Sequence, residues 1–267
     1  MHYLTVVAYA VPIVLVGVMS PPSHAQDEQY VTIDTRPGVS QAFMLIEPAV
    51  KPVASVILFA GGTGLIGISP TGIRSKNNFL VRTRRLFAQQ GFIVATVDAP
   101  SDRQTGDGLI GFRSGNAHAQ DIKAVIAWLK RKAEIPVWVI GTSRGSISAA
   151  NSAARISEGG PDGVVLTATV TEPSKSRPYT VFDAKLKTIR QPVLIVHHKS
   201  DGCRVSPYSG AALVAKKLKS SHKVEAIAFE GGEPPKSGAC DALSYHGFLG
   251  IEDAVVKAIA DWIKHVS

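Results

Sequence analysis

The sequence predicts an α/β fold with one domain and a mostly parallel central sheet flanked by helices. Three observations support this. Strand-like and helix-like segments alternate along most of the chain. Several strand-like segments are continuous apolar runs, which is typical of strands buried on both faces of a parallel sheet. The chain has 267 residues, of which 45% are hydrophobic and 19% charged, so it can bury one sizeable core.

In the first half of the chain, turn signals separate the predicted elements. Arg36-Pro37-Gly38 separates two short strands, and Gly91 closes a helix whose apolar side chains have helical spacing. The apolar strand that precedes this helix is followed by a glycine-rich loop, residues 61–72. A second polar, glycine-rich loop covers residues 101–115. The predicted strands are residues 30–34, 41–47, 53–60 and 92–97, and the predicted helix is residues 78–90.

The second half alternates more regularly. A strongly amphipathic helix is followed by an apolar strand, and further strands and helices then follow in turn. The connector 171–190 is too short to form a large cap domain over the sheet. A long loop, residues 230–247, precedes the last helix. The predicted helices are residues 116–132, 146–156, 208–219 and 250–266, and the predicted strands are residues 135–140, 163–170, 193–197 and 223–229.

The N-terminus differs in kind from the rest of the chain. Residues 4–19 are almost wholly apolar, and the first 25 residues contain no Asp, Glu, Lys or Arg. The run ends in Ser23-His24-Ala25, a small-x-small pattern. We interpret residues 1–25 as a secretory signal peptide and residues 26–267 as the mature domain, which would be secreted or periplasmic. The usual N-terminal Lys or Arg is missing, and the alternative is an uncleaved membrane anchor, although Pro12 interrupts a run that is short for a span.

The charge distribution argues against a nucleic-acid partner. The formal net charge is +8 and the sequence pI is about 9.5. However, the Lys and Arg residues are scattered, and no basic patch interleaved with aromatic residues occurs. Lys130, Arg131 and Lys132 end a predicted helix, where cations interact favourably with the helix dipole.

The most informative stretch is the turn Gly141-Thr142-Ser143-Arg144-Gly145. It follows an apolar strand and opens into a helix of small residues. A serine held at such a turn is pushed out of both elements, and flanking glycines relieve the crowding. We therefore predict that Ser143 is a nucleophile. The pattern also arises by chance, in which case Ser143 would be a structural serine.

A serine nucleophile needs a base and an orienting acid, and polar residues follow other predicted strands. In an open α/β sheet the active groups gather beyond the carboxyl ends of the strands. Asp201 follows one buried strand, and His246 lies in the loop after the next. We predict that they are the acid and the base. Asp241, five residues before the histidine, is the alternative acid.

With these residues in place, the chain resembles α/β-hydrolases of the esterase and dienelactone-hydrolase-like type over about residues 30–266. The order Ser143, Asp201, His246 matches the family order of nucleophile, acid and base. The resemblance implies an oxyanion hole formed by the amide of Arg144 and by an amide after the strand at residues 53–60, with Gly62 as first choice and Thr63 next. Many members have His-Gly there, whereas this chain has Ala60-Gly61. No metal or organic cofactor is implied.

The two cysteines lie close to the predicted acid and base. Cys203 is two residues after the acid and Cys240 six residues before the base. If the acid and base loops meet, a disulfide between these cysteines is geometrically plausible and would fix one loop against the other. The alternative is two unpaired thiols.

A competing motif is Gly62-Thr63-Gly64-Leu65-Ile66-Gly67, which reads as G-x-G-x-x-G after a strand. Pro70 and Gly72 prevent a helix from opening at the third glycine, and no acidic residue ends a strand about 20 positions later. We therefore disfavour dinucleotide binding.

The sequence thus predicts a serine hydrolase that cleaves carboxylic esters of a small-molecule or acyl substrate. Leu109, Ile110 and Phe112 are predicted to line the substrate site, with loop anchoring as the alternative role. A peptidase or thioesterase with the same triad, and a catalytically silent binding protein on the same fold, are the alternative functions. Neither a nucleic acid nor, after cleavage of the signal, a membrane is an expected partner.

Overall fold

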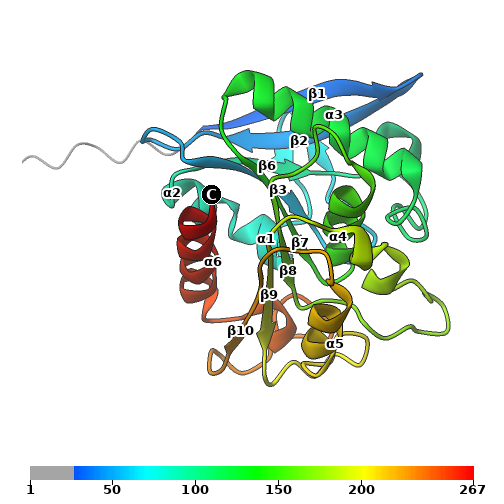
Figure 1. Ribbon diagram of the computed structural model, residues 1–267, viewed down its shortest axis with the longest axis vertical. Coiled ribbons are helices and arrows are strands. Elements are labelled where there is room, and N and C mark those ends of the chain that lie inside the picture. Colours follow the sequence, from blue (N-terminus) through cyan, green and yellow to red (C-terminus); the bar gives the residue numbers. More distant parts are fainter. Residues whose placement is uncertain (1–26) are drawn as a thin grey trace, which may run out of the picture.

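The computed structural model describes residues 27–267 (Figure 1). The predicted signal peptide therefore lies outside the described residues. The centre of the fold is an eight-stranded sheet with the order β1-β2-β6-β3-β7-β8-β9-β10. Its strands are β1 (Glu28–Arg36), β2 (Val39–Ile46), β3 (Ala54–Phe59), β6 (Phe92–Val97), β7 (Val137–Thr142), β8 (Gly163–Thr167), β9 (Val193–His198) and β10 (Val224–Phe229).

The sheet is parallel except at one edge. β1 and β2 form an antiparallel hairpin, and β2 pairs antiparallel with β6. All other neighbours are parallel, and β3 lies between β6 and β7, so that Val56 is in register with both Val94 and Trp138. The carboxyl ends of β3, β7, β8, β9 and β10 consequently open at the same edge of the sheet.

Helices cover both faces of the sheet (Figure 1). Two hydrophobic cores lie between the sheet and these helices, one on each face. In β3, Ile57 and Phe59 belong to the first core, whereas Val56 and Leu58 belong to the second. The first face carries α3 (Asn116–Lys132), α4 (Gly145–Arg155) and α5 (Gly210–Lys217), and the second carries α1 (Phe79–Arg82), α2 (Arg84–Gln89) and α6 (Glu252–Val266).

Three local expectations differ from the structure. The helix predicted at residues 78–90 is divided into α1 and α2 at Thr83, whose hydroxyl donates to the Phe79 carbonyl at 2.7 Å. The strand predicted at residues 163–170 ends at Thr167, because Ala168 has a left-handed backbone with φ +43°. The loop after β3 contains a small hairpin, β4 (Ile68–Ser69) and β5 (Gly72–Ile73), so no helix opens at the end of the G-x-G-x-x-G sequence.

The connector between β8 and β9 adds no further domain. It contains two short 3₁₀ turns, Val181–Asp183 and Leu186–Thr188, which pack on α4. In the part of the chain that the structure describes, no helix combines the length and hydropathy needed to span a membrane.

Candidate active site

A tight turn joins β7 to α4 and holds Ser143 in the left-handed region of backbone space, with φ +52°. A Cβ on Gly141 would lie 2.2 Å from the Gly145 carbonyl oxygen. A Cβ on Gly145 would lie 2.2 Å from the Phe59 carbonyl oxygen in β3. Both positions therefore require glycine, and the turn is as sharp as the sequence predicts.

The backbone of the turn is fixed on both sides of the serine. The Ser143 amide donates to the Thr167 carbonyl in β8 at 2.9 Å. The Ser143 carbonyl accepts from the amide of Ser146 at 3.0 Å and from its hydroxyl at 2.6 Å. Ser143 is half-buried and lines a cavity of about 50 Å³. A side chain is thus presented to this cavity by a backbone that has little freedom to move.

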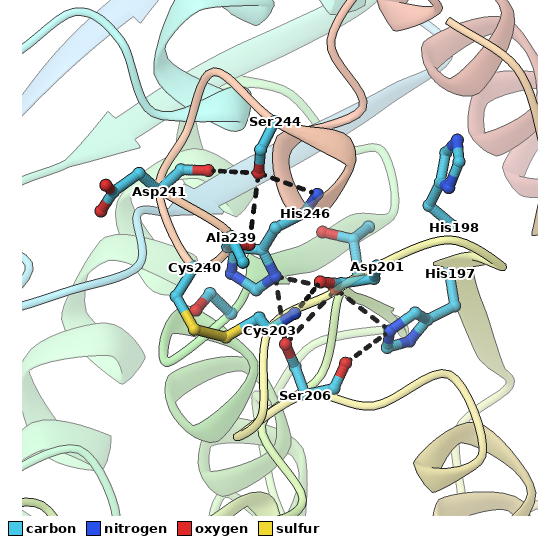
Figure 2. A network of polar contacts seen from close by, with 12 residues as sticks. His197, His198, Asp201, Cys203, Ser206, Ala239, Cys240, Asp241, Ser244 and His246 are labelled. Carbon is cyan, nitrogen blue, oxygen red and sulfur yellow. Dashed lines mark hydrogen bonds and ion pairs between the residues drawn. A yellow bond between two sulfur atoms is a disulfide. The ribbon is translucent and has the colours of Figure 1, made fainter. Parts of the chain in front are cut away.

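His246 and Asp201 form the second part of the site (Figure 2). The histidine lies in a 3₁₀ turn, Tyr245–Gly247, and its amide donates to the hydroxyl of Ser244 at 3.2 Å. Its Nδ1 lies 2.8 Å from Oδ2 of Asp201, which follows β9. The alternative acid, Asp241, accepts from the Gly238 amide instead. The structure therefore pairs the histidine with the predicted carboxylate.

This pairing determines which ring nitrogen of His246 is available for chemistry. A proton on Nδ1 is held by the Asp201 carboxylate, so Nε2 carries the lone pair of the neutral ring. Nε2 is buried and has no hydrogen-bond partner among the described residues. His246 lines the same small cavity as Ser143. Ser143 and the histidine with the unpartnered basic nitrogen thus line the same cavity.

Two further side chains contact the Asp201 carboxylate. The Ser206 hydroxyl lies 3.3 Å from Oδ2 and 3.1 Å from Nδ1 of His246. His197 Nε2 lies 3.3 Å from Oδ2 and donates to the Ser206 carbonyl at 2.9 Å. The Cys203 amide donates to Oδ1 at 2.9 Å. The carboxylate is thus held at both oxygens (Figure 2).

These contacts decide the ionisation of Asp201. Burial alone would raise the pKa of this carboxyl, but the contacts from His197, His246 and the Cys203 amide outweigh it and lower the pKa to about 2. The group is therefore a carboxylate at neutral pH and can stabilise a positive charge on His246.

Sequence reasoning did not assign roles to Ser206 and His197. Ser206 lies in an irregular loop whose path no periodicity predicts. His197 lies near the end of β9. Its position four residues before Asp201, where the chain turns back after β9, was the one available signal.

The structure places two of the three predicted oxyanion donors, Gly62 and Arg144, beside the serine. Gly62 lines the Ser143 cavity, and a Cβ on its neighbour Gly61 would lie 2.9 Å from the Ser143 Cβ. The Arg144 amide lies at the N-terminus of α4, where the helix dipole favours negative charge. Thr63 lines only the adjoining cavity of about 400 Å³. The amides of Gly62 and Arg144 therefore remain our first choice for the oxyanion hole.

The predicted substrate-lining residues lie beside this site. Leu109 and Ile110 line a small cavity next to the Arg144 side chain. Phe112 packs between His118, at 5.7 Å between ring centroids, and the Arg103 guanidinium, 4.6 Å from its ring. Among the described residues that line the Ser143 cavity, none is one of these three. Their contact with a substrate stays a prediction.

The two cysteines form the predicted disulfide. Cys203 is buried and Cys240 is exposed, and their Cα atoms lie 4.5 Å apart. The bond closes a segment with a sequence separation of 37 and connects the loop of Asp201 to the loop of His246 (Figure 2). Cys240 also lines the Ser143 cavity. The covalent connection thus lies at the site itself.

The lowered pKa of Asp201 predicts a specific loss of stability in acid. Its folded pKa of about 2 lies below the ordinary value of 3.8, so its contribution is complete above about pH 4 and lost as the pH falls toward 2. This contribution is about 2 kcal/mol, because one pKa unit corresponds to about 1.4 kcal/mol. Denaturant unfolding between pH 5 and 2 should show this drop in the wild type and not in Asp201→Asn. Equal pH slopes for both proteins would contradict the assignment, and Asp241→Asn is the matched control.

Loss of the disulfide should destabilise the fold. For a sequence separation of 37, the chain-entropy model gives about 4 kcal/mol for Cys203→Ala combined with Cys240→Ala. Urea unfolding with and without reductant measures this loss. We expect reductant to weaken the wild type by a similar amount and to leave the double variant unchanged. A wild type that is insensitive to complete reduction, verified by thiol alkylation, would rule out a stabilising bond.

Comparisons with known proteins support the fold. No protein-family model and no curated protein sequence matches the chain. Among solved structures, the chain is similar to a dienelactone hydrolase from Anabaena variabilis, with TM-score 0.61, 15% identity, and coverage of 91% of this chain and 99% of that one. It is also similar to a thermostable carboxyl esterase from Bacillus coagulans, with TM-score 0.62, 15% identity, and coverage of 90% of this chain and 98% of that one. A third similar structure is a Pyrococcus furiosus esterase, with TM-score 0.64, 14% identity, and coverage of 96% of this chain and 99% of that one. With its mainly parallel sheet covered on both faces, the chain has the α/β-hydrolase fold.

Proposed function

We propose that the protein is a serine hydrolase that cleaves carboxylic esters, with Ser143 as nucleophile, His246 as general base and Asp201 as orienting acid. One arrangement carries the proposal. Nδ1 of His246 is held by the buried carboxylate of Asp201, and its Nε2 has no partner among the described residues. The histidine lines the same cavity as Ser143, which lies at a turn with a left-handed backbone. The unpartnered nitrogen alone does not distinguish His246, because ring nitrogens of His118 and His197 are also buried without a partner. What distinguishes His246 is that it lines the same cavity as Ser143.

The reaction follows from these positions. Nε2 of His246 takes the proton of the Ser143 hydroxyl as the serine oxygen attacks the ester carbonyl. The Asp201 carboxylate stabilises the imidazolium that forms. The oxygen of the tetrahedral intermediate carries a negative charge, which the amides of Gly62 and Arg144 bind. The imidazolium then gives its proton to the leaving alcohol. Water, deprotonated by the same nitrogen, hydrolyses the acyl-enzyme.

The surroundings of the serine favour a small acyl group. The Ser143 cavity has a volume of about 50 Å³, and Phe79 and Ala242 line it together with residues of the surrounding loops. The larger neighbouring cavity shares Gly61, Gly62 and Asn78 with it, so a leaving group has space to extend along the loop after β3. The similar structures named as esterases and dienelactone hydrolase add support for ester substrates.

We also propose that the protein is exported, and that residues 1–25 are removed on export. The disulfide between Cys203 and Cys240 supports this location, because such bonds form and persist in oxidising compartments.

A fluorophosphonate probe and an ester panel test the proposal. We expect the probe to label Ser143, and Ser143→Ala to lose labelling and at least about 10⁴-fold in kcat for p-nitrophenyl esters, because the nucleophile is removed. Ser152→Ala is the matched control, since the hydroxyl of this buried serine donates to the Ser148 carbonyl within α4. It should retain near wild-type activity.

The same measurements separate the other functions. Labelling of Ser143 with activity confined to peptides or thioesters would keep the triad and overturn the ester assignment. A wild-type protein that is neither labelled nor active would be a silent binding protein on this fold, and the proposal would fail.

A further inference from the structure

A buried arginine behind the loop after β3 has no role in the reaction described above. Arg113 lies in the loop before α3 and is 3% exposed. No carboxylate of the described residues forms an ion pair with it, and its Nε has no partner there. Burying a cation without a counter-ion is costly, so a fold that retains one needs a reason for it.

The guanidinium connects two elements that flank Ser143. One terminal nitrogen donates to the carbonyl of Ala60 at 3.0 Å and to that of Gly62 at 3.4 Å. The other donates to the hydroxyl of Ser148 on α4 at 2.7 Å. The loop that supplies one predicted oxyanion donor is thereby tied to the helix whose N-terminus supplies the other.

Three successive peptide groups of this loop are restrained, two of them by Arg113 and the one between them by the Gly64 amide. Arg113 holds the carbonyls of the Ala60–Gly61 and Gly62–Thr63 peptides. The peptide between them carries the Gly62 amide, and its carbonyl, that of Gly61, accepts from the Gly64 amide at 3.1 Å. Because the N–H and C=O of a trans peptide point in opposite directions, the bond from the Gly64 amide to the Gly61 carbonyl sets the direction of the Gly62 N–H. Arg113 holds the peptides on either side and so limits rotation of the one between them.

The loop needs such support because of its composition. Gly61 and Gly62 lack side chains that would limit rotation, and Gly62 already has φ +58°. A rotation of the Gly61–Gly62 peptide would turn the predicted donor away from the oxyanion. Gly64 makes room for the guanidinium, because a Cβ there would lie 2.7 Å from a terminal nitrogen of Arg113.

The charge of Arg113 is not neutralised by its surroundings. The neighbouring His118 is also buried, and burial, together with the charges of Arg113 and Arg36, lowers the pKa of His118 to about 3, so this ring is neutral. Burial and the charge of Arg144 lower the pKa of Arg113 itself to about 9, which leaves the guanidinium protonated at neutral pH. A positive charge therefore remains directly behind the donor loop, where it favours negative charge at the serine.

We propose that Arg113 is a positioning residue of the oxyanion hole, which holds the Gly62 amide in register with the Arg144 amide through its contacts to Ala60, Gly62 and Ser148. This inference rests on the proposed function, since it requires an oxyanion to form at Ser143. It predicts that changes at Arg113 weaken the transition state more than they weaken substrate binding.

The test compares Arg113 with a second arginine that contacts α4 but not the loop after β3. Arg155 of α4 donates to the Ser114 carbonyl at 3.1 Å and to the Asn116 side chain at 2.7 Å, so it ties α4 to the start of α3. The variants are Arg113→Met, Arg113→Lys and Arg155→Met. The readouts are kcat and KM for a p-nitrophenyl ester, the rate of Ser143 phosphonylation by a fluorophosphonate, and thermal unfolding.

We expect Arg113→Met to lower kcat and the phosphonylation rate by about 10- to 100-fold with KM within about threefold, because loss of one oxyanion donor costs up to about 10³. Arg113→Lys retains the positive charge but lacks the two terminal nitrogens that contact the loop and α4, so it should recover only part of the lost kcat. Arg155→Met should stay within about threefold of wild type at a similar unfolding temperature.

Each other outcome is decisive. Equal rates for the Arg113 and Arg155 variants, or an effect confined to KM, would overturn the positioning role. The proposed function would still hold if the wild type is labelled and active. If Arg113→Met does not fold, full wild-type kcat in Arg113→Lys overturns the role and a reduced kcat supports it. An unlabelled, inactive wild type would remove the proposed function and this inference together.

Discussion

The close approach of α4 to β3 is the constraint on which the site depends. Gly145 meets the Phe59 carbonyl so closely that no side chain fits between them, and Gly141 meets Gly145 in the same way. With both contacts in place, the chain passes from β7 to α4 through a residue in the left-handed conformation, which is Ser143. The same contact brings Gly61 against the serine. The geometry of the proposed nucleophile is therefore a consequence of how one helix packs on one strand.

The rest of the site is supplied by loops, and each loop is restrained by a different interaction. A disulfide restrains the loop of His246 against that of Asp201. Contacts from His197, His246 and the Cys203 amide keep the Asp201 carboxylate ionised, and the Ser206 hydroxyl also contacts it. On the opposite side of the serine, a buried guanidinium restrains a loop of glycines. Loops have few apolar contacts of their own, so polar and covalent contacts supply the precision that catalysis requires.

Much of this architecture could be predicted from the sequence, because apolar runs and helical spacing are local signals. The order of strands and helices and the turn at Ser143 follow from such signals. The pairing of Cys203 with Cys240 was expected only on the condition that the loops of the predicted acid and base meet. The break at Thr83, where the side-chain hydroxyl donates to the carbonyl of Phe79, was not predicted, because the helical spacing of the apolar residues continues across it. Ser206 and Arg113 were missed for a related reason: their partners are distant in sequence and come together only through the paths of irregular loops.

Direct detection of the acyl-enzyme tests the central claim most sharply. The protein is mixed with p-nitrophenyl acetate, quenched in acid within milliseconds to seconds, and digested for peptide mass analysis. We predict a burst of p-nitrophenol that approaches one equivalent and an acetyl group on Ser143 that decays at the rate of turnover. Steady hydrolysis with no acyl group on Ser143, or with the group on another residue, would contradict the account.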